Sequence, residues 1–243
     1  MLVAVIGAQG RMGRAMGEGV DAHPDHEVVA RLDRGDDISP ETLGGAEIAI
    51  EFTGPESTLG NVLALIDAGV HVVVGSTGWT ESDYEQVRDR LADHRDLGVL
   101  IAPNFALSAV LAMDFARRAA PFFESVEVIE LHHPDKVDAP SGTAIATAQA
   151  IARARVGNQS PDRTEGDRSA RGKNVEGIHV HAVRLRGLTA HEEILLGNPG
   201  EQLSIRTDSF DRSSFLPGVL LGIEKTPARP GLTIGLDQVM DLS

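Results

Sequence analysis

Short apolar runs alternate with longer amphipathic stretches through the first hundred residues of the chain. Runs rich in β-branched residues predict strands, and apolar residues three and four positions apart predict helices. The predicted strands are 2–6, 27–33, 47–53, 71–75 and 98–102. Helical spacing lies between them at Met12, Ala15, Met16, Gly19 and Val20, at Leu59, Val62, Leu63 and Ile66, and at Tyr84, Val87 and Leu91. Strands that alternate with helices form βαβ units, so this part is predicted to be a doubly wound parallel sheet. The third helix has a capping-box-like start, Thr80 followed by Asp83.

The pattern changes after Phe105. A helix is predicted over 108–120, an apolar strand over 126–131 and another helix over 142–156. Residues 157–176 are polar and almost free of aliphatic side chains, which predicts a long mobile loop. Three strand signals follow at 178–185, 192–196 and 202–207, with a turn at 197–200. Their short connections predict an antiparallel or mixed sheet.

The end of the chain is assigned back to the first domain. One more helix is indicated by Phe215, Val219, Leu220 and Ile223, and a last strand by 232–236. The predicted organisation is a first domain of residues 1–104 and 214–243. An α+β domain of residues 105–213 is inserted into it.

Composition narrows the possible partners. Lys and Arg number 22 against 36 Asp and Glu, which gives a formal charge of −14, and only 4% of residues are aromatic. Nucleic acid is an unfavourable partner for such a surface. Because the chain has no cysteine, disulfides, thiolate metal sites and thiol nucleophiles are excluded. The chain begins almost directly with a strand and has no apolar stretch long enough to span a bilayer, so a cytoplasmic protein without a membrane partner is expected.

A glycine-rich segment joins the first predicted strand to the first helix. Its sequence is Gly7-Ala8-Gln9-Gly10-Arg11-Met12-Gly13, and Asp33 stands at the end of the second strand. Glycines at such a turn let the backbone approach a pyrophosphate, and the acid can bond ribose hydroxyls. The alternative is a glycine-rich turn that binds no nucleotide. Arg34 could accept the 2′-phosphate of NADP, whereas Asp33 favours NAD, so both cofactors stay open.

Two other loops follow predicted parallel strands. Open α/β sheets bind ligands at the carboxyl ends of their strands, so both loops are expected to meet the cofactor. Ordinary turn chemistry is the alternative explanation of the same residues. The expected contacts are Gly75, Ser76 and Thr77 in one loop and Ala102, Pro103, Asn104 and Phe105 in the other.

The segment from His132 to Ala144 carries the remaining chemistry. If the strand runs through His133, the two imidazoles point to opposite faces, and only one is expected to transfer a proton. Lys136 is a compact cation, and Ser141-Gly142-Thr143 opens a helix whose free N–H groups favour an anion. Together they predict a site for an anionic substrate, such as a dicarboxylate, that must be protonated. A structural histidine pair and a metal site are the alternatives, although no HxxxH or cysteine pair supports a metal.

The same segment, Glu130 to Ala144, resembles the signature of the dihydrodipicolinate reductase family. The resemblance extends through Gly7 to Gly13, Gly75 to Gly78, Ala102 to Phe105, Ala170 to Lys173 and Asn198 to Glu201. It implies reduction of a cyclic dicarboxylic imine by NADH or NADPH in the diaminopimelate branch of lysine synthesis. It also implies a Rossmann-type domain, completed by the C-terminal segment, and a substrate domain that assembles a homotetramer.

Residue roles follow from the same resemblance. His132 is similar to the family's acid/base and Lys136 to its second catalytic residue, while His133, Gly142 and Thr143 are similar to its substrate contacts. The sequence departs from many relatives at Asp33, where Glu is also common. It departs again at 184–188, which replaces a more glycine-rich stretch and is expected to affect the sheet but no catalytic position.

Two other functions remain as alternatives. A nucleotide-sensing regulator would bind NAD(P) without turnover, because a Rossmann fold alone does not imply catalysis. A different Rossmann oxidoreductase, such as a sugar dehydrogenase, would share the cofactor but not the substrate. The combination of His132 and Lys136 favours an enzyme that protonates its substrate.

Overall fold

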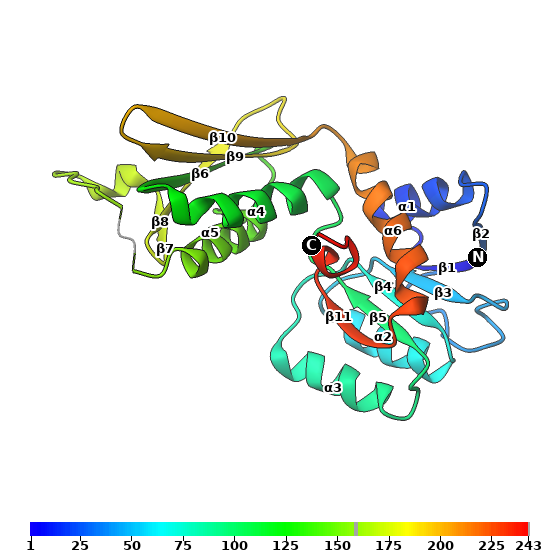
Figure 1. The fold of residues 1–243 in the computed structure, drawn as a ribbon. Coiled ribbons are helices and arrows are strands. Elements are labelled where there is room, and N and C mark those ends of the chain that lie inside the picture. Colours follow the sequence, from blue (N-terminus) through cyan, green and yellow to red (C-terminus); the bar gives the residue numbers. More distant parts are fainter. Residues whose placement is uncertain (158–159, 243) are drawn as a thin grey trace. The chain divides into compact units, whose positions relative to one another are not determined.

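The computed structural model describes residues 1–157 and 160–242, which divide into two units (Figure 1). One unit is formed by residues 1–107 with the C-terminal segment from residue 212, and the other by residues 108–211. The boundaries proposed from the sequence lie a few residues away from these. Among the helices of the described residues, none is long and apolar enough to cross a bilayer.

The first unit is a Rossmann-like parallel sheet of six strands in the order β11-β5-β4-β3-β1-β2. Its last strand, β11, pairs in parallel with β5, which confirms that the end of the chain returns to this sheet. Its strands are β1 (Leu2–Ile6), β2 (Glu27–Leu32), β3 (Ile48–Glu51), β4 (His71–Val74), β5 (Gly98–Ile101) and β11 (Gly231–Ile234). Its helices are α1 (Arg11–Asp21), α2 (Thr58–Asp67), α3 (Glu81–Leu91) and α6 (Leu216–Lys225).

Helices cover both faces of this sheet. The apolar sides of α2 and α3 pack on one face in a single core cluster with alternate residues of the strands. On the other face, Gly17 of α1 lies against Val5 and Gly222 of α6 lies against Val73 and Leu100. Burial on both faces explains why the central strands read as continuous apolar runs rather than alternating ones.

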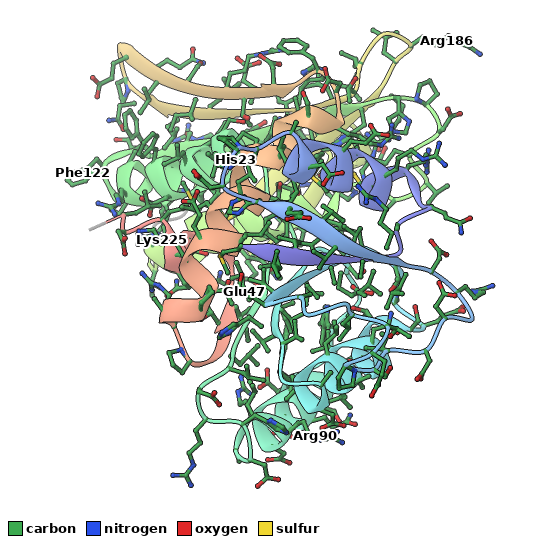
Figure 2. The ribbon with its side chains drawn as sticks, turned by 90° about the vertical axis from the view of Figure 1, so that its right-hand side faces the viewer. His23, Glu47, Arg90, Phe122, Arg186 and Lys225 are labelled. Carbon is green, nitrogen blue, oxygen red and sulfur yellow. The ribbon has the colours of Figure 1, made fainter. Side chains whose placement is uncertain are left out.

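A capping box at Thr80 defines the start of α3, and an ion pair joins α3 to α2. The Thr80 hydroxyl oxygen accepts a hydrogen bond from the backbone N–H of Asp83, and the Asp83 carboxylate accepts one from the backbone N–H of Thr80, so the predicted capping box is confirmed. Near its other end, Arg90, labelled in Figure 2, forms an ion pair with Asp67 of α2.

The second unit contains a mixed sheet of five strands in the order β10-β9-β6-β8-β7. Strands β6 and β8 are parallel and the other pairs are antiparallel, so the predicted mixed sheet is confirmed. Helices α4 and α5 pack their alanine-rich sides on one face of it. The elements are α4 (Leu107–Ala119), β6 (Ser125–His132), α5 (Gly142–Ala154), β7 (Lys173–Val175), β8 (Ile178–Arg184), β9 (Ala190–Asn198) and β10 (Glu201–Ser209). Short 3₁₀ turns lie at Ala120–Phe122, Arg168–Arg171, Arg212–Phe215, Thr226–Ala228 and Leu236–Val239.

The prediction of one structureless loop over 157–176 is wrong in its second half. This segment contains a 3₁₀ turn and the edge strand β7, which pairs with β8. In β7 only Val175 is buried, so the strand leaves almost no apolar pattern in the sequence. A tight turn at Glu176 and Gly177, both with positive φ, joins it to β8. Residues 158–159 of the predicted loop lie outside the described residues.

Candidate active site

Strand β6 carries an acid and a histidine on the face that the helices cover. Alternate residues of a strand share a face, and Val126, Val128 and Glu130 of β6 are all buried. His132, two positions further, continues this row and is the last residue of the strand. A carboxylate in a row of buried aliphatic side chains needs polar partners.

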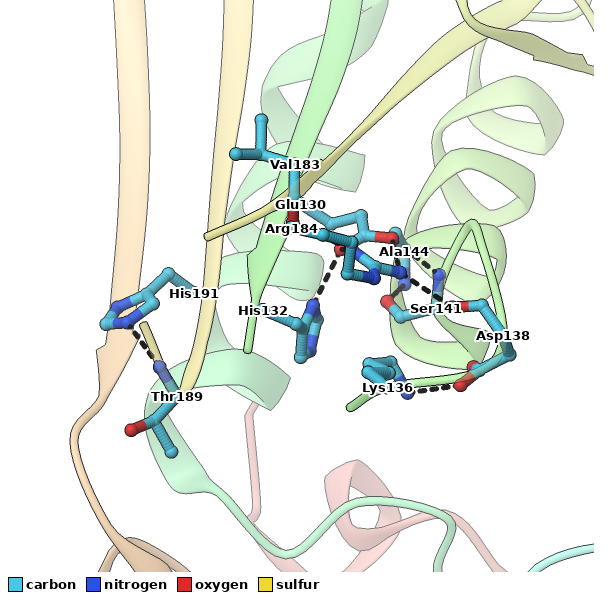
Figure 3. A network of polar contacts seen from close by, with 10 residues as sticks. All are labelled: Glu130, His132, Lys136, Asp138, Ser141, Ala144, Val183, Arg184, Thr189 and His191. Atoms are coloured by element: carbon cyan, nitrogen blue, oxygen red, sulfur yellow. Dashed lines mark hydrogen bonds and ion pairs between the residues drawn. The ribbon is translucent and has the colours of Figure 1, made fainter. Parts of the chain in front are cut away.

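Three residues supply these partners to Glu130 (Figure 3). Arg184 of β8 donates from Nη1 to Oε2 at 2.7 Å and from Nη2 to Oε1 at 2.8 Å. The backbone N–H of Ser141 donates to Oε1 at 3.0 Å, and Nδ1 of His132 lies 2.6 Å from Oε2. Burial opposes the charge of Glu130, but the hydrogen bonds from Arg184, His132 and Ser141 outweigh it and lower the pKa of this carboxyl. Glu130 is therefore ionised at neutral pH.

The contact with Glu130 determines how the His132 ring can act. A carboxylate beside Nδ1 favours a proton on that atom and leaves Nε2 as the nitrogen that gains and loses a proton. Burial lowers the pKa of His132; the hydrogen bond and charge of Glu130 oppose this, while the charges of Lys136 and Arg184 reinforce it. The His132 imidazolium thus gives up its proton more readily than that of an ordinary histidine.

Lys136 and the start of α5 hold a carboxylate that belongs to the chain itself. Nζ of Lys136 donates to Oδ1 of Asp138 at 2.7 Å (Figure 3). The pKa of Asp138 is lowered first by this bond, and also by a hydrogen bond from the backbone of Gly142. The expectation that the Gly142 N–H is free for a ligand is therefore wrong for this structure. In this structure Lys136 and the backbone of Gly142 bind the carboxylate of Asp138.

The helix start around this carboxylate is also as predicted. Ser141 caps α5, since its side chain accepts a hydrogen bond from the backbone of Ala144 at 3.2 Å. Gly142 is exposed and Thr143 half-buried in the first turn of α5.

His133 differs from the sequence prediction. Strand β6 ends at His132, so the alternation of faces does not extend to His133. The chain turns instead, and the backbone N–H of Lys136 donates to the carbonyl oxygen of His133 at 3.2 Å. The His133 side chain is exposed.

Arg184, Glu130 and Asp138 are the polar residues that sequence reasoning missed. The segment 184–188 was expected to leave the catalytic positions untouched, and this is wrong because Arg184 binds the carboxylate that binds His132. Arg184 is also the residue of β8 that is paired with His132 of β6 in the sheet. The available signal was Glu130 itself, an acid at an inward position of an apolar strand.

In the first unit, the glycine loop has a geometry that only glycine permits at two positions. Gly7 has φ of +82°, and a Cβ there would lie 2.7 Å from the carbonyl oxygen of Phe52. A Cβ on Gly13 would collide with the carbonyl oxygen of Gly7. The loop then enters α1 with Gly10 as N-cap, and Ala8, Gln9, Arg11 and Met12 complete it without being buried.

Asp33 lies beside this loop, as predicted. Its Oδ2 accepts the N–H of Gln9 at 2.7 Å and its Oδ1 accepts the N–H of Arg34 at 2.8 Å. These backbone bonds, that of Arg34 first, lower the pKa of Asp33. Each carboxylate oxygen has a further lone pair for a ligand hydroxyl, and the Arg34 side chain is exposed. A glycine loop at a helix N-terminus beside an ionised carboxylate fits a dinucleotide.

The two other predicted loops lie at the same sheet edge as the glycine loop, because β1, β4 and β5 are parallel. Gly75, Ser76 and Thr77 follow β4, and the Ser76 hydroxyl is buried without a hydrogen-bond partner among the described residues. Ala102 to Phe105 follow β5, where Phe105 packs on Phe52 with ring centroids 6.1 Å apart. The structure thus gathers the cofactor residues predicted from the sequence at one edge.

Comparison with known families gives matches to both halves of the chain. A family model described as "Dihydrodipicolinate reductase, N-terminus" matches residues 1–105, and one described as "Dihydrodipicolinate reductase, C-terminus" matches residues 108–240. The 4-hydroxy-tetrahydrodipicolinate reductase of Bifidobacterium animalis subsp. lactis is 58% identical over 250 residues, covering 99% of each chain. That of Beutenbergia cavernae is 54% identical over 244 residues, covering 99% of this chain and 98% of the other.

Solved structures agree with these matches. A dipicolinate-bound dihydrodipicolinate reductase from Paenisporosarcina sp. TG-14 is similar with a TM-score of 0.89 and 34% identity, over 99% of both chains. A probable dehydrogenase from Thermotoga maritima has a TM-score of 0.63 at 12% identity, over 98% of this chain and 92% of that one. The second likeness shows the fold alone.

Proposed function

The chain belongs to the dihydrodipicolinate reductase family, and on this basis we propose that His132 is the proton donor and a nicotinamide dinucleotide the hydride donor of its reaction. The protein is an oxidoreductase with 4-hydroxy-tetrahydrodipicolinate reductase activity, in lysine biosynthesis through diaminopimelate. The single observation that carries the proton assignment is the 2.6 Å contact between His132 and the buried, ionised Glu130.

The first unit is of the NAD(P)-binding kind, and its glycine loop is the proposed dinucleotide site. When bound, NADH or NADPH supplies the hydride. The N–H groups at the start of α1 would face the pyrophosphate, and Asp33 would accept hydrogen bonds from ribose hydroxyls. Arg34 is the candidate for contact with the 2′-phosphate of NADPH. The loops at 75–77 and 102–105 would contact the nicotinamide half.

The second unit is proposed to bind the dicarboxylate substrate. Lys136 and the backbone N–H groups of Gly142 and Thr143 are the groups that would hold a carboxylate, with His133 as a further contact. A charged N–H donor and a helix N-terminus both stabilise an anion. Since Asp138 accepts from Lys136 and Gly142, it would release these donors when substrate binds.

His132 then completes the reduction. Loss of the 4-hydroxyl group as water gives the conjugated ring, and addition of a hydride to that ring leaves an electron pair that must take up a proton. His132 as imidazolium donates it from Nε2 and becomes neutral, while Glu130 keeps the ring oriented through Nδ1. This is general acid catalysis, and Glu130 stabilises the charged form that donates.

Replacement of His132 tests the assignment. We expect His132→Gln to lower kcat about 10²- to 10⁴-fold, because the proton donor is lost. The dissociation constant for NADH, measured by fluorescence titration, should stay unchanged.

A matched control is His181→Gln, which replaces a histidine of β8 that contacts Glu127 instead. It should keep the wild-type kcat. A wild-type kcat for His132→Gln at saturating substrate and cofactor would refute His132 as the proton donor.

The resemblance to the family also supports a homotetramer built by the second unit, which we include in the proposal.

A further inference from the structure

Glu51 is a fully buried acid that the proposed mechanism does not use. It is the last residue of β3, and its side chain has no solvent exposure. The three residues before it are apolar and equally buried. A carboxylate in such a place is tolerated only where enough hydrogen-bond donors surround it. The identity of these donors therefore indicates what Glu51 does.

The donors to Glu51 among the described residues come from the segment that follows β3. Its Oε1 accepts from the hydroxyl of Thr53, from the backbone N–H of Thr53 at 3.3 Å and from Nδ2 of Asn61 at 3.2 Å. Its Oε2 accepts from the hydroxyl of Thr58, in the first turn of α2, at 2.8 Å. Glu51 thus binds both ends of the connection between β3 and α2, residues 52–57, which we call the β3–α2 loop.

The hydroxyl of Thr53 has all its bonding capacity in use. It donates its one proton to Glu51. Its oxygen accepts from the hydroxyl of Ser57 at 3.0 Å and from Nδ2 of Asn61 at 3.2 Å. Thr53 is itself exposed, so it is held by polar bonds that lead to a buried acid rather than by burial of its own side chain.

The β3–α2 loop lies where the strand order of the first sheet reverses. β1 and β3 are neighbours, but the chain continues from β1 to β2 on one side and from β3 to β4 on the other. In open α/β sheets, ligands bind outside the carboxyl ends of the strands at such a switch point. The glycine loop follows β1 and the β3–α2 loop follows β3, so these two loops flank the expected position of a dinucleotide.

The β3–α2 loop also contacts the other loops of the proposed cofactor site. A Cβ on Gly7 would lie 2.7 Å from the carbonyl oxygen of Phe52 and 3.0 Å from Cγ2 of Thr53. The Phe52 ring lies so close to Gly75 that a Cβ there would collide with it, and it packs on the Phe105 ring. A shift of the β3–α2 loop would therefore be passed on to the loops on both sides.

We propose that Glu51 is a positioning residue for the cofactor: by accepting the hydrogen bonds of Thr53, it holds the β3–α2 loop in place as one wall of the dinucleotide site. The inference rests on the proposed cofactor site of the first unit. Because Glu51 has no solvent exposure, it acts through Thr53 and does not touch the cofactor. A wall that is ordered before the ligand arrives lowers the entropy cost of binding.

The decisive variant is Glu51→Met, whose side chain has a similar length but no oxygen to accept from Thr53. The dissociation constant for NADH, measured by calorimetric titration, should rise about tenfold, because the wall of the site is no longer held by these hydrogen bonds. The kcat at saturating NADH and the KM for the dicarboxylate should stay near their wild-type values, since the groups around His132 are unchanged. A lower kcat with unchanged NADH affinity would overturn the inference.

Two further variants separate positioning from a general loss of stability. Glu51→Gln keeps an oxygen for Thr53, and its amide can donate to the Thr58 hydroxyl, which accepts as well as donates. It should bind NADH nearly like wild type. Glu47→Met removes a carboxylate just before β3, at the opposite end of the strand, where Glu47 (Figure 2) accepts the backbone N–H of Leu2 at 2.8 Å. It should leave NADH affinity unchanged.

These variants can also contradict the inference. If Glu47→Met weakens NADH binding as much as Glu51→Met does, the effect belongs to the stability of the sheet and the inference is overturned. It is equally overturned if Glu51→Gln binds NADH as weakly as Glu51→Met, since an acceptor for Thr53 is then not what matters.

Asn61→Leu makes the test independent of how well Glu51→Met folds. Asn61 is a half-buried residue of α2 that donates to both Glu51 and Thr53. Its replacement leaves the bond between the Thr53 hydroxyl and Glu51 in place, so the dissociation constant for NADH should rise by less, about two- to threefold. An unchanged dissociation constant in Asn61→Leu would contradict the inference.

The wild-type protein in the same titration separates this inference from the proposed function. If wild type binds neither NADH nor NADPH, the proposed cofactor site and the inference both fail. If wild type binds NADH and Glu51→Met binds it equally well, the inference alone fails and the proposed cofactor site stands.

Discussion

At the residue scale, the centre of the polar network in the second unit is the buried carboxylate of Glu130 rather than a histidine. Glu130 has no solvent exposure and binds His132, Arg184 and Ser141 at once. Charged groups in an interior are tolerated only when all their hydrogen-bonding capacity is used. The orientation of His132 therefore depends on every partner of Glu130.

Arg184 should matter for both stability and rate. Arg184→Met leaves Glu130 buried without its paired cation, which is expected to cost about 3–5 kcal/mol of unfolding free energy. The rate should fall as well, because His132 loses its fixed partner geometry. Urea unfolding and steady-state kinetics measure the two effects.

The control for Arg184 is Arg206→Met, which removes an exposed arginine paired with Asp208. Exposed ion pairs contribute about 0–1 kcal/mol, so this variant should be close to wild type. Equal stabilities of the Arg184 and Arg206 variants would contradict the role of Arg184.

The sequence identifies His132 and Lys136 as the candidate proton donor and cation, because an imidazole and an ammonium group stand shortly before the start of a helix; their roles stay predictions. It does not indicate the pairing of Glu130 with Arg184. These residues are 54 positions apart, and their contact depends on the parallel register of β6 and β8, which no local pattern encodes. Asp138 is missed for another reason, since a carboxylate in a loop is usually solvated.

At the scale of elements, periodicity predicts most helices and strands, and its failures are at the ends and edges. Strands β3 to β5 are buried apolar runs with clear limits. Strand β7 has a single buried residue and is held by pairing with β8 rather than by its own apolar face. The predicted strand through His133 fails because β6 ends one residue earlier and the chain turns at Pro134 and Asp135.

The junction of the glycine loop and α1 gives a prediction of its own. Gly13→Ala places a Cβ against the carbonyl oxygen of Gly7, and backbone atoms cannot rotate away. The loop must then shift, and its backbone N–H groups no longer point toward the pyrophosphate. Binding of NADH should therefore weaken at least about tenfold. Calorimetric titration with NADH measures this.

A glycine on another helix provides the comparison. Gly60 of α2 is exposed, and a Cβ added there would meet no other atom within 4 Å. Gly60→Ala should bind NADH like wild type and gain up to about 1 kcal/mol of stability, since alanine favours a helix. Normal NADH affinity in Gly13→Ala would show that the loop tolerates the change.

At the scale of the whole molecule, the buried Glu192 makes stability depend on pH. Its folded-state pKa of about 7 lies above the ordinary glutamate value of 4.5, so between these values the native state holds a proton that the unfolded chain releases. Stability is therefore highest at low pH with respect to this group, and it falls as the pH rises from about 4.5 toward 7.

Glu192→Gln should remove that loss. The measured quantity is the unfolding free energy of the variant minus that of the wild type. This difference should be about 2–4 kcal/mol larger at pH 8 than at pH 4.5. Thermal unfolding of both proteins across this range is the measurement. Parallel stability curves would mean that Glu192 ionises normally in the folded protein.

Assembly is the other property of the whole molecule. For a homotetramer, light scattering should give about four times the 25.8 kDa of one chain. A mass that stays at one chain over the concentrations used for kinetics would refute this part of the proposal.

The bond between Asp138 and Lys136 bears on which anions the protein can take up. If the substrate carboxylate accepts from Lys136 and Gly142, it must replace the carboxylate of Asp138 there. It does not bind to a lysine that lacks a counter-charge. An intramolecular competitor acts at an effective concentration on the order of millimolar or higher. Chloride, acetate and other single-contact anions should lose that competition. A dicarboxylate whose second carboxylate binds elsewhere in the site can displace Asp138 from Lys136. The selectivity for dicarboxylates would then arise from the bond between Asp138 and Lys136.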